Sequence, residues 1–483
     1  MSNRATKIVA TLGPASSDPA LLERMIRAGV NVVRLNFSHG KAEDHIERAR
    51  LVREASQRAG REVAIMADLQ GPKIRVGKFA DSKVFLEQGQ SFVLDAARTE
   101  LGDLQAVGLD YKALPREVKA GDVLLLNDGL IVLDVTAVRG EQVHTTVRLG
   151  GELSNNKGIN KQGGGLTAPA LTAKDMEDIR TAMRLQADYV AVSFPKNATD
   201  MEMARQLCYV AGAEWDHKPG LIAKIERAEA IPKLEEILSA SDGIMVARGD
   251  LAVEVGDAAV PALQKRMIRL AREKNKLAIT ATQMMESMIL SPAPTRAEVS
   301  DVANAVLDGT DAVMLSAETA SGRYPVETVE AMARICEEAE KSAAVTLDHE
   351  FLNQVFTRID QTISLAAIWT AHHLKVKAIA ALTESGATAL WMSRLNCGVP
   401  VYALTPQAEA VTKMSLYRAV FPLFMKQRPT TRDELLYDAE QLLMNEGIVV
   451  KGDFIVLTAG DPMGTSGGTN TLKIVRVGDQ QTC

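Results

Sequence analysis

Two charged residues interrupt the apolar run LIAKIE at residues 221–226. Lys224 and Glu226 are two positions apart in a run of strand type, so their side chains leave the same face. Burying an ammonium and a carboxylate is unfavourable unless the two groups pair with each other or bind a ligand. The pair indicates either a structural ion pair or a functional site, and the ends of the other apolar runs decide between them.

Polar residues close most of the other short apolar runs. In a barrel of parallel strands, chemistry takes place at the C-terminal ends of the strands. So many polar strand ends on one rim are hard to explain by stability alone, and we interpret them as an active site. Besides Lys224 and Glu226, they are Arg34, Asn36, Ser38, Asp68, Arg248, Asp250, Thr282, Ser316 and Glu318.

The residue types at this rim indicate a phosphorylated acid as the substrate. Glu226 and Asp250 end adjacent strand-like runs, and two such carboxylates completed by substrate oxygens suit Mg²⁺ better than Ca²⁺. Lys224 and Arg34 offer fixed positive charge to a phosphoryl group. Gly249 and Asp250 open a helical pattern, whose first N–H groups can bind a carboxylate.

The composition limits the class of protein. A chain of 483 residues is too long to fold around one small hydrophobic core, so two or three domains are expected. The net charge of −6 argues against general nucleic-acid binding, and the four dispersed cysteines are typical of reduced thiols. The first residues lack an apolar segment of signal-peptide length, and no run is long enough to span a bilayer. We expect a soluble, cytoplasmic protein that uses neither nucleic acid nor a membrane.

Strand-like runs alternate with helical patterns often enough to predict a TIM (β/α)₈ barrel. One such helix spans 18–28, with Asp18 as its N-cap and Gly29 as its C-cap. The competing doubly wound sheet would carry a GxGxxG turn after its first strand, which GPAS at 13–16 does not supply. The eight runs lie at 7–14, 31–40, 62–71, 188–194, 220–226, 243–250, 277–283 and 311–318.

Two further domains are predicted. Short alternating segments with Gly and Asn-Asp turns predict an inserted antiparallel β-barrel domain. A Gly-rich stretch at 161–170 is the expected hinge where the chain returns from this domain to the barrel. The last part of the chain predicts an α/β domain with mostly parallel strands in 377–386, 400–406, 447–461 and 469–477. The expected boundaries are 1–71 with 168–340 for the barrel, 72–167 for the insertion and 341–483 for the C-terminal domain.

Seven motifs occur in order along the chain: TLGPAS, NVVRLNFSHG, ADLQGPKIR, AKIE, MVARGDLAVE, ATQMMESM and MLSAETASG. Together they resemble the pyruvate kinase family from end to end. The resemblance implies phosphoryl transfer from phosphoenolpyruvate to ADP, which gives pyruvate and ATP in the last step of glycolysis. It also implies Mg²⁺, for which Mn²⁺ can substitute, a mobile β lid, a C-terminal domain for an allosteric effector, and a homotetramer.

The resemblance also implies roles for single residues at the barrel mouth. Lys224 resembles the lysine that stabilises the transferring phosphoryl group, and Glu226 and Asp250 resemble the Mg²⁺ ligands. Gly249 and Thr282 resemble the residues that hold the substrate carboxylate. The remaining assignments are Arg34 on the substrate phosphate, and Arg75 and Lys157 on the nucleotide phosphates beside Asn36, Ser38 and His39. For protonation of the enolate we favour a water or hydroxyl relay through Thr282 and Ser316, because Lys224 is a poor donor if it stays charged on phosphate.

One departure from the family pattern bears on potassium. Potassium-dependent members have Glu where this chain has Lys73, and a Thr-Lys pair where it has Leu69 and Gln70. A lysine ammonium is a compact charge on a flexible stem, so Lys73 can supply the charge that K⁺ brings elsewhere. We therefore expect a potassium-independent bacterial type of enzyme. The oxygens of the monovalent-cation pocket would come from Asn36, Ser38, Asp68 and Leu69.

A second anion site is predicted in the C-terminal domain. The stretch 383–388 follows a buried strand and opens a helix, where hydroxyl and free N–H groups form an anion nest. An ordinary N-cap turn is the alternative, and the family resemblance favours a site for the phosphate of an effector, either a sugar phosphate or AMP. Its residues are Thr383, Glu384, Ser385, Gly386 and Thr388.

Two other functions are compatible with parts of this pattern. A magnesium-dependent pyruvate-enolate lyase or aldolase also sets a Glu and an Asp around the metal, but it has no need of a lid carrying Lys157. A catalytically silent metabolite sensor would keep the C-terminal nest, yet the rim residues Lys224, Glu226 and Asp250 are all present. Both alternatives explain fewer of these residues than a pyruvate kinase function does.

Overall fold

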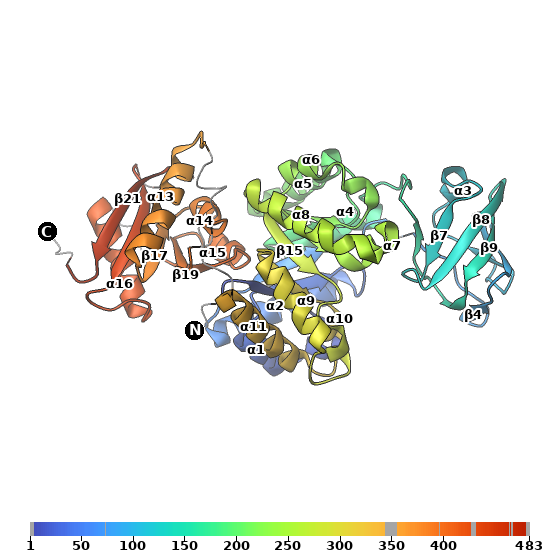
Figure 1. Ribbon diagram of the computed structural model, residues 1–483, viewed down its shortest axis with the longest axis horizontal. Coiled ribbons are helices and arrows are strands. Elements are labelled where there is room, and N and C mark those ends of the chain that lie inside the picture. Colours follow the sequence, from blue (N-terminus) through green and yellow to red (C-terminus); the bar gives the residue numbers. More distant parts are fainter. Residues whose placement is uncertain are drawn as a thin grey trace.

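The structure is a computed structural model of the chain. Figure 1 shows three bodies in a row, with the barrel in the middle, the inserted β domain at one end and the C-terminal α/β domain at the other. The residues described are 4–72, 74–342, 355–395, 397–426, 431–462, 464 and 467–479.

Eight parallel strands close into a barrel, in the order β1-β16-β15-β14-β13-β12-β3-β2. All eight arise from the apolar runs that predicted them, and the (β/α)₈ barrel is confirmed. Their side chains are almost entirely buried because helices cover the outside and a second core fills the inside. The strands are β1 Lys7–Thr11, β2 Val32–Asn36, β3 Ala64–Asp68, β12 Tyr189–Val192, β13 Gly220–Ile225, β14 Gly243–Ala247, β15 Leu277–Ala281 and β16 Ala312–Leu315.

The helices between these strands follow the expected start and stop signals. The first helix begins after Asp18, whose side chain accepts a hydrogen bond from Leu21 N at 2.8 Å, and it ends at Gly29 with φ 134°. The predicted caps of this helix are confirmed. The barrel helices are α1 Pro19–Ala28, α2 Ala42–Ala59, α4 Ala173–Arg184, α5 Ala198–Gly212, α6 Leu234–Ala240, α7 Arg248–Val255, α8 Val260–Glu273, α9 Arg296–Leu307, α10 Ala317–Ala320 and α11 Pro325–Ser342.

The insertion leaves the barrel after β3 and folds around a core of its own. Its strands form a six-stranded sheet in the order β11-β7-β8-β9-β5-β6 and a two-stranded sheet β10-β4. All these pairs are antiparallel except β5 with β6. The elements are β4 Lys83–Leu86, β5 Ser91–Asp95, β6 Ala106–Gly108, α3 Leu114–Glu117, β7 Val123–Leu126, β8 Ile131–Arg139, β9 Gln142–Leu149, β10 Gly151–Ser154 and β11 Ile159–Lys161.

The C-terminal domain is a five-stranded sheet in the order β19-β18-β17-β20-β21, parallel except for β20 with β21. The sequence did not predict β19, and only Phe454–Gly460 of the run 447–461 forms a strand. Pro422 lies inside β19, and a proline is tolerated there because β19 is an edge strand. The elements are α13 Ile359–Leu374, β17 Ala378–Leu382, α14 Ala387–Ser393, β18 Val401–Thr405, α15 Ala408–Met414, β19 Val420–Phe424, α16 Arg432–Asn445, β20 Phe454–Gly460 and β21 Thr469–Arg476.

The C-terminal domain closes the end of the barrel where the strands begin. Leu416 is fully buried and belongs to the core inside the barrel, together with Met66 and Ile222. Arg394, 1 % exposed, forms an ion pair with the buried Asp311 at the start of β16. The described residues of the C-terminal domain do not cover the opposite end of the barrel, where the strands end and the insertion begins. That end is therefore the candidate position of the active site. No helix within the described ranges is both long and apolar enough to cross a bilayer.

Candidate active site

Strand register brings the predicted polar residues to one rim. Asn36 of β2 pairs with Asp68 of β3, and Asp68 pairs with Ala191 of β12. Lys224 of β13 pairs with Met245 of β14, and α7 begins directly after that strand. Because all the strands are parallel, their last residues lie at the same end of the barrel.

Lys224 stands at the centre of a buried cluster. Its Nζ lies 3.0 Å from Glu226 Oε1 and 3.2 Å from Asp68 Oδ1, and it donates a hydrogen bond of 2.7 Å to Ser193 Oγ. The Lys224 side chain is 11 % exposed and both carboxylates are 1 % exposed. The pair seen in the sequence is thus an ion pair, and it belongs to a larger group of charges from three strands.

Arg34 adds a second cation to the cluster. Its Nε donates to Asp68 Oδ2 at 2.5 Å, and its Nη1 donates to Thr11 Oγ1 at 3.1 Å. Burial alone would raise the pKa of Asp68, but Arg34 and Lys224 outweigh it and hold that pKa below its usual value. Burial alone would lower the pKa of Lys224, and the attraction of Asp68 and Glu226 reverses this, so the ammonium stays charged.

Burial raises the pKa of Glu226 to about 7, even though Lys224 acts in the opposite direction. Its Oε2 accepts a hydrogen bond of 2.9 Å from Phe194 N, while Oε1 faces Lys224. Asp250 lies in the first turn of α7, and its negative charge contributes to the raised pKa of Glu226. Each carboxylate oxygen has two lone pairs, so both groups retain capacity for a hard cation.

No group of three or more His, Cys, Asp or Glu side chains in the described parts of the chain could hold a metal ion. A cation at Glu226 and Asp250 would therefore need further oxygen ligands from substrate or water. That requirement is typical of Mg²⁺ sites in phosphoryl-transfer enzymes, where substrate phosphate oxygens complete the shell.

Gly249 and Thr282 contact each other at the ends of β14 and β15. Gly249 N donates to Thr282 Oγ1 at 2.8 Å, and this hydroxyl donates to Ala281 O at 2.6 Å. Thr282 has φ 70°, a conformation that β-branched residues rarely adopt. Backbone strain of this kind gathers at functional sites, where the surrounding structure holds it in place.

Two charged rim residues have structural partners. Arg248 is 9 % exposed, and its guanidinium donates to Thr282 O and to Asp301 Oδ1 of α9, both at 2.7 Å. It thereby braces the loop that carries Thr282. Glu318 accepts hydrogen bonds from Ser316 N at 2.6 Å and Met285 N at 3.2 Å, so it orders the turn after β16. A charge at a strand end is not by itself a catalytic group.

The residues predicted for the nucleotide come from two places. Arg75 and Lys157 lie on neighbouring segments of the insertion, since Val76 N donates to Lys157 O at 2.9 Å and Arg75 Nη1 donates to Asn156 O at 2.9 Å. Asn36, Ser38 and His39 lie at and after the end of β2, where Ser38 N donates to Asn36 Oδ1 at 3.1 Å.

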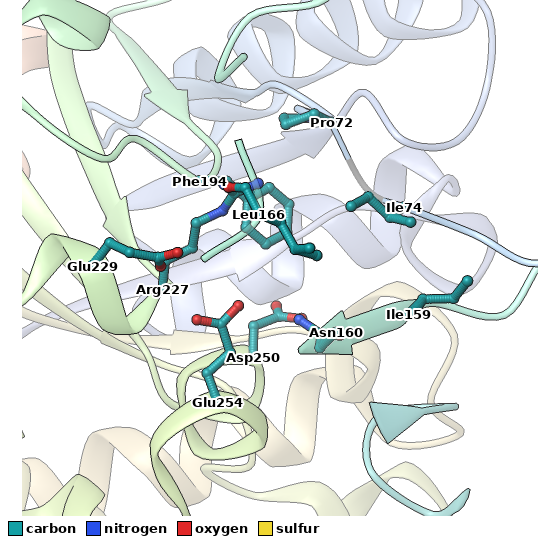
Figure 2. Close-up of a pocket in the computed structure, with 10 residues that line it drawn as sticks. All are labelled: Pro72, Ile74, Ile159, Asn160, Leu166, Phe194, Arg227, Glu229, Asp250 and Glu254. Carbon is teal, nitrogen blue, oxygen red and sulfur yellow. The ribbon is translucent and has the colours of Figure 1, made fainter. Parts of the chain in front are cut away.

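A narrow pocket lies between the insertion and the barrel (Figure 2). Figure 2 shows Asp250, Glu254 and Asn160 gathered on one side, with Ile74 and Ile159 of the insertion across from Arg227. Glu254 accepts a hydrogen bond from Ala228 N at 2.8 Å, and Arg227 donates to Leu166 O at 3.2 Å. These contacts connect the exit segment of the insertion to α7, the helix that begins with Gly249 and Asp250.

The oxygens predicted for a monovalent cation already have protein donors in part. Leu69 O accepts from Ser193 Oγ at 2.7 Å, and Asn36 Oδ1 accepts from Ser38 N. Asp68 Oδ1 is buried and faces Lys224 at 3.2 Å without a well-directed hydrogen bond, as suits an oxygen that faces positive charge. Lys73 lies outside the described residues.

The predicted effector loop joins β17 to α14. Gly386 N donates to Thr383 Oγ1 at 2.9 Å, and Gly386 has φ 84°. The Glu384 carboxylate accepts from Gln407 Nε2 at 3.0 Å. Thr388 is 2 % exposed, and its hydroxyl shares a hydrogen bond of 2.6 Å with Thr469, so it faces β21. The loop is built as a turn closed by its own hydroxyl.

The sequence pattern did not predict a role for Ser193 and Phe194, which directly follow β12. Ser193 contacts Lys224, and Phe194 contacts Glu226. A serine and a phenylalanine at the end of an apolar run carry no signal of function, because such residues are common there. Their importance follows from contacts between separate strands.

This geometry suits a (β/α)₈-barrel enzyme that handles a phosphorylated acid. Comparison with known proteins agrees: the family model for the pyruvate kinase barrel domain matches residues 3–329, and the model for the pyruvate kinase alpha/beta domain matches residues 361–475. Pyruvate kinase II of Salmonella typhimurium is 51% identical over 98% of this chain and 99% of its own length. Pyruvate kinase of Haemophilus influenzae is 49% identical over 95% of this chain and 96% of its own length. The chain belongs to the pyruvate kinase family and is a phosphotransferase.

Proposed function

We propose that the rim around Lys224 transfers the phosphoryl group of phosphoenolpyruvate to ADP, giving pyruvate and ATP. The observation that carries the proposal is the convergence of Asp68 from β3 with Lys224 and Glu226 at the end of β13, which places both carboxylates within 3.2 Å of the ammonium. Phosphoryl transfer depends mainly on positioning and on neutralising charge, and a fixed buried ammonium provides both. The barrel of residues 1–71 and 168–340 carries the active site, the insertion of residues 72–167 acts as the lid, and the C-terminal domain of residues 341–483 binds the effector.

Glu226 and Asp250 are the proposed protein ligands of Mg²⁺, with Mn²⁺ as a substitute. The ion supplies positive charge to the oxygens of the substrate and nucleotide. The raised pKa of Glu226 supports this assignment, because a buried carboxylate of this kind gains most from a nearby cation.

Lys224 and Arg34 hold the phosphoryl group, and Gly249 with Thr282 hold the substrate carboxylate. Arg34 is fixed by Asp68, so its guanidinium keeps one orientation. The Gly249 amide and the Thr282 hydroxyl are within hydrogen-bond distance of each other and can both turn to a carboxylate. Thr282 and Ser316 pass a proton towards the enolate, because Lys224 is a poor donor while its ammonium remains paired.

Arg75 and Lys157 of the lid contact the nucleotide phosphates, beside Asn36, Ser38 and His39. Their support is the pairing of the two lid segments, which keeps two cations together. The enzyme works without K⁺, since this chain has Lys73 where potassium-dependent members have Glu. Asn36, Ser38, Asp68 and Leu69 supply the oxygens of the monovalent-cation pocket. Asp68 already faces Arg34 and Lys224, and this supports a pocket that collects positive charge.

Thr383, Glu384, Ser385, Gly386 and Thr388 belong to the proposed site for an effector phosphate, from a sugar phosphate or AMP. The turn closed by Thr383 Oγ1 supports a role for this loop. Thr388 is buried and packs behind the loop against Thr469. The homotetramer and the cytoplasmic location follow from membership of the family and are proposed on that ground.

The experiment that tests the function measures ATP and pyruvate from phosphoenolpyruvate and ADP in the presence of Mg²⁺. Equal amounts of the two products are expected. A lyase or aldolase would release pyruvate without ATP, and a silent sensor would bind effector without turnover.

A further inference from the structure

Ser193 carries a buried hydroxyl directly after β12, a barrel strand at whose end the sequence pattern predicted no functional residue. It is 1 % exposed and makes two hydrogen bonds of 2.7 Å, one from Lys224 Nζ and one to Leu69 O. Because a carbonyl oxygen can only accept, the hydroxyl proton of Ser193 points to Leu69 and its lone pairs face the ammonium.

The other two partners of Lys224 have additional ties. Asp68 also holds Arg34 at 2.5 Å, and Glu226 also accepts from Phe194 N and is a proposed metal ligand. A cation bound to Glu226 partly neutralises this carboxylate, and its attraction for the Lys224 ammonium becomes weaker. Ser193 is neutral, so its hydrogen bond keeps its strength when the charges around the ammonium change.

The position of Ser193 is itself set by close packing. Gly71 lies against it with φ +66°, and a Cβ at Gly71 would approach Ser193 Cβ to 2.7 Å. On the other side, Phe194 adopts φ 57°, and its ring lies 5.3 Å from the Arg227 guanidinium. A residue held from both sides can hold a lysine, whose four-carbon stem is otherwise flexible.

We propose that Ser193 is a positioning residue that fixes the Lys224 ammonium in the place where it meets the transferring phosphoryl group. The proposal rests on the role given to Lys224 above. Ser193 acts through its hydrogen bonds with Lys224 and with the main chain of Leu69.

The test compares Ser193→Ala and Ser193→Cys with wild type in steady-state kinetics. Loss of a hydrogen bond to a charged group is expected to lower kcat by about 10- to 100-fold. The KM for phosphoenolpyruvate should change by less than about threefold, because the ammonium acts most strongly in the transition state. The cysteine fills the space, but its thiol is a weak donor and acceptor, so it should be slow as well.

Ser241→Ala is the matched control. Ser241 is also 1 % exposed and also donates a hydrogen bond of 2.7 Å, to Ile237 O, but it precedes β14 at the opposite end of the barrel. This variant should lose thermal stability comparable to that of Ser193→Ala while keeping kcat within about twofold of wild type.

Three results would overturn the proposal while wild type remains active: both Ser193 variants keeping kcat within about twofold of wild type, a rise in KM at constant kcat, or failure of both variants to fold. A wild-type enzyme that makes no ATP from phosphoenolpyruvate and ADP would instead overturn the function on which the proposal rests. The two failures are thus distinguishable in one assay.

Discussion

Lys224 Nζ and Glu226 Oε1 lie 3.0 Å apart at the mouth of the barrel, from residues two positions apart on one strand face. The ion pair holds the Lys224 ammonium and the Glu226 carboxylate in fixed positions at this mouth. Catalytic groups held in place in advance do not have to be reoriented during the reaction, and such groups are the most effective stabilisers of charge in a transition state.

Removing either proposed metal ligand should weaken cation binding. We expect Glu226→Gln and Asp250→Asn each to lower the affinity for Mn²⁺ by at least about 10-fold, since even groups outside the ligand shell contribute this much. Titration of free enzyme with Mn²⁺, followed by electron paramagnetic resonance, measures it. Glu318→Gln is the control, because this buried carboxylate binds Ser316 N and Met285 N. Unchanged affinity in both ligand variants would refute the metal site.

Potassium should be dispensable. With tetramethylammonium as the sole monovalent cation, we expect the wild-type enzyme to keep its activity, because Lys73 supplies the charge. Lys73→Glu should create a requirement for K⁺, seen as activation on addition of KCl to the variant alone. A wild-type enzyme that needs added K⁺ would disprove the idea.

Glu254 should make stability depend on pH. Burial raises its pKa from 4.5 to about 7, so the folded state keeps a proton that the unfolded state loses in that window. The contribution of this proton is fully present below pH 4.5 and lost as the pH rises through about 7. Glu254→Gln removes this pH dependence. The unfolding free energy of the variant relative to that of wild type should therefore rise by about 3 kcal/mol between pH 4.5 and pH 8, since each pKa unit corresponds to about 1.4 kcal/mol. Urea unfolding at both pH values measures this, and a gap that does not change with pH would contradict it.

The joint between the barrel and the C-terminal domain should depend on Arg394. It donates to Asp311 and to Lys276 O at 2.7 Å, and both members of the ion pair are buried. Arg394→Met leaves a buried carboxylate without its cation, at a loss of about 3–5 kcal/mol of unfolding free energy. Arg180→Met, which breaks an exposed ion pair on α4, should change stability by less than about 0.5 kcal/mol. Equal effects of the two variants would show that the buried pair is unimportant.

Sequence periodicity predicted the barrel well because parallel strands that are buried on both faces appear as continuous apolar runs. Polar residues at the ends of these runs located Lys224, Glu226 and Asp68, which the structure brings together. The pattern could not separate Arg248 from them, since its partner Asp301 lies on a distant helix. It also missed β19, where Pro422 breaks the strand pattern at a sheet edge.

The most direct test of the central claim compares Lys224→Met with wild type in the formation of ATP and pyruvate from phosphoenolpyruvate and ADP with Mg²⁺. Lys83→Met, on an exposed ion pair of the insertion, is the control. We predict equal amounts of both products from wild type and the control, and a loss of about 10²- to 10³-fold in kcat for Lys224→Met, because a preorganised charge at the reacting group is removed. A folded Lys224→Met enzyme that turns over at the wild-type rate would contradict the account.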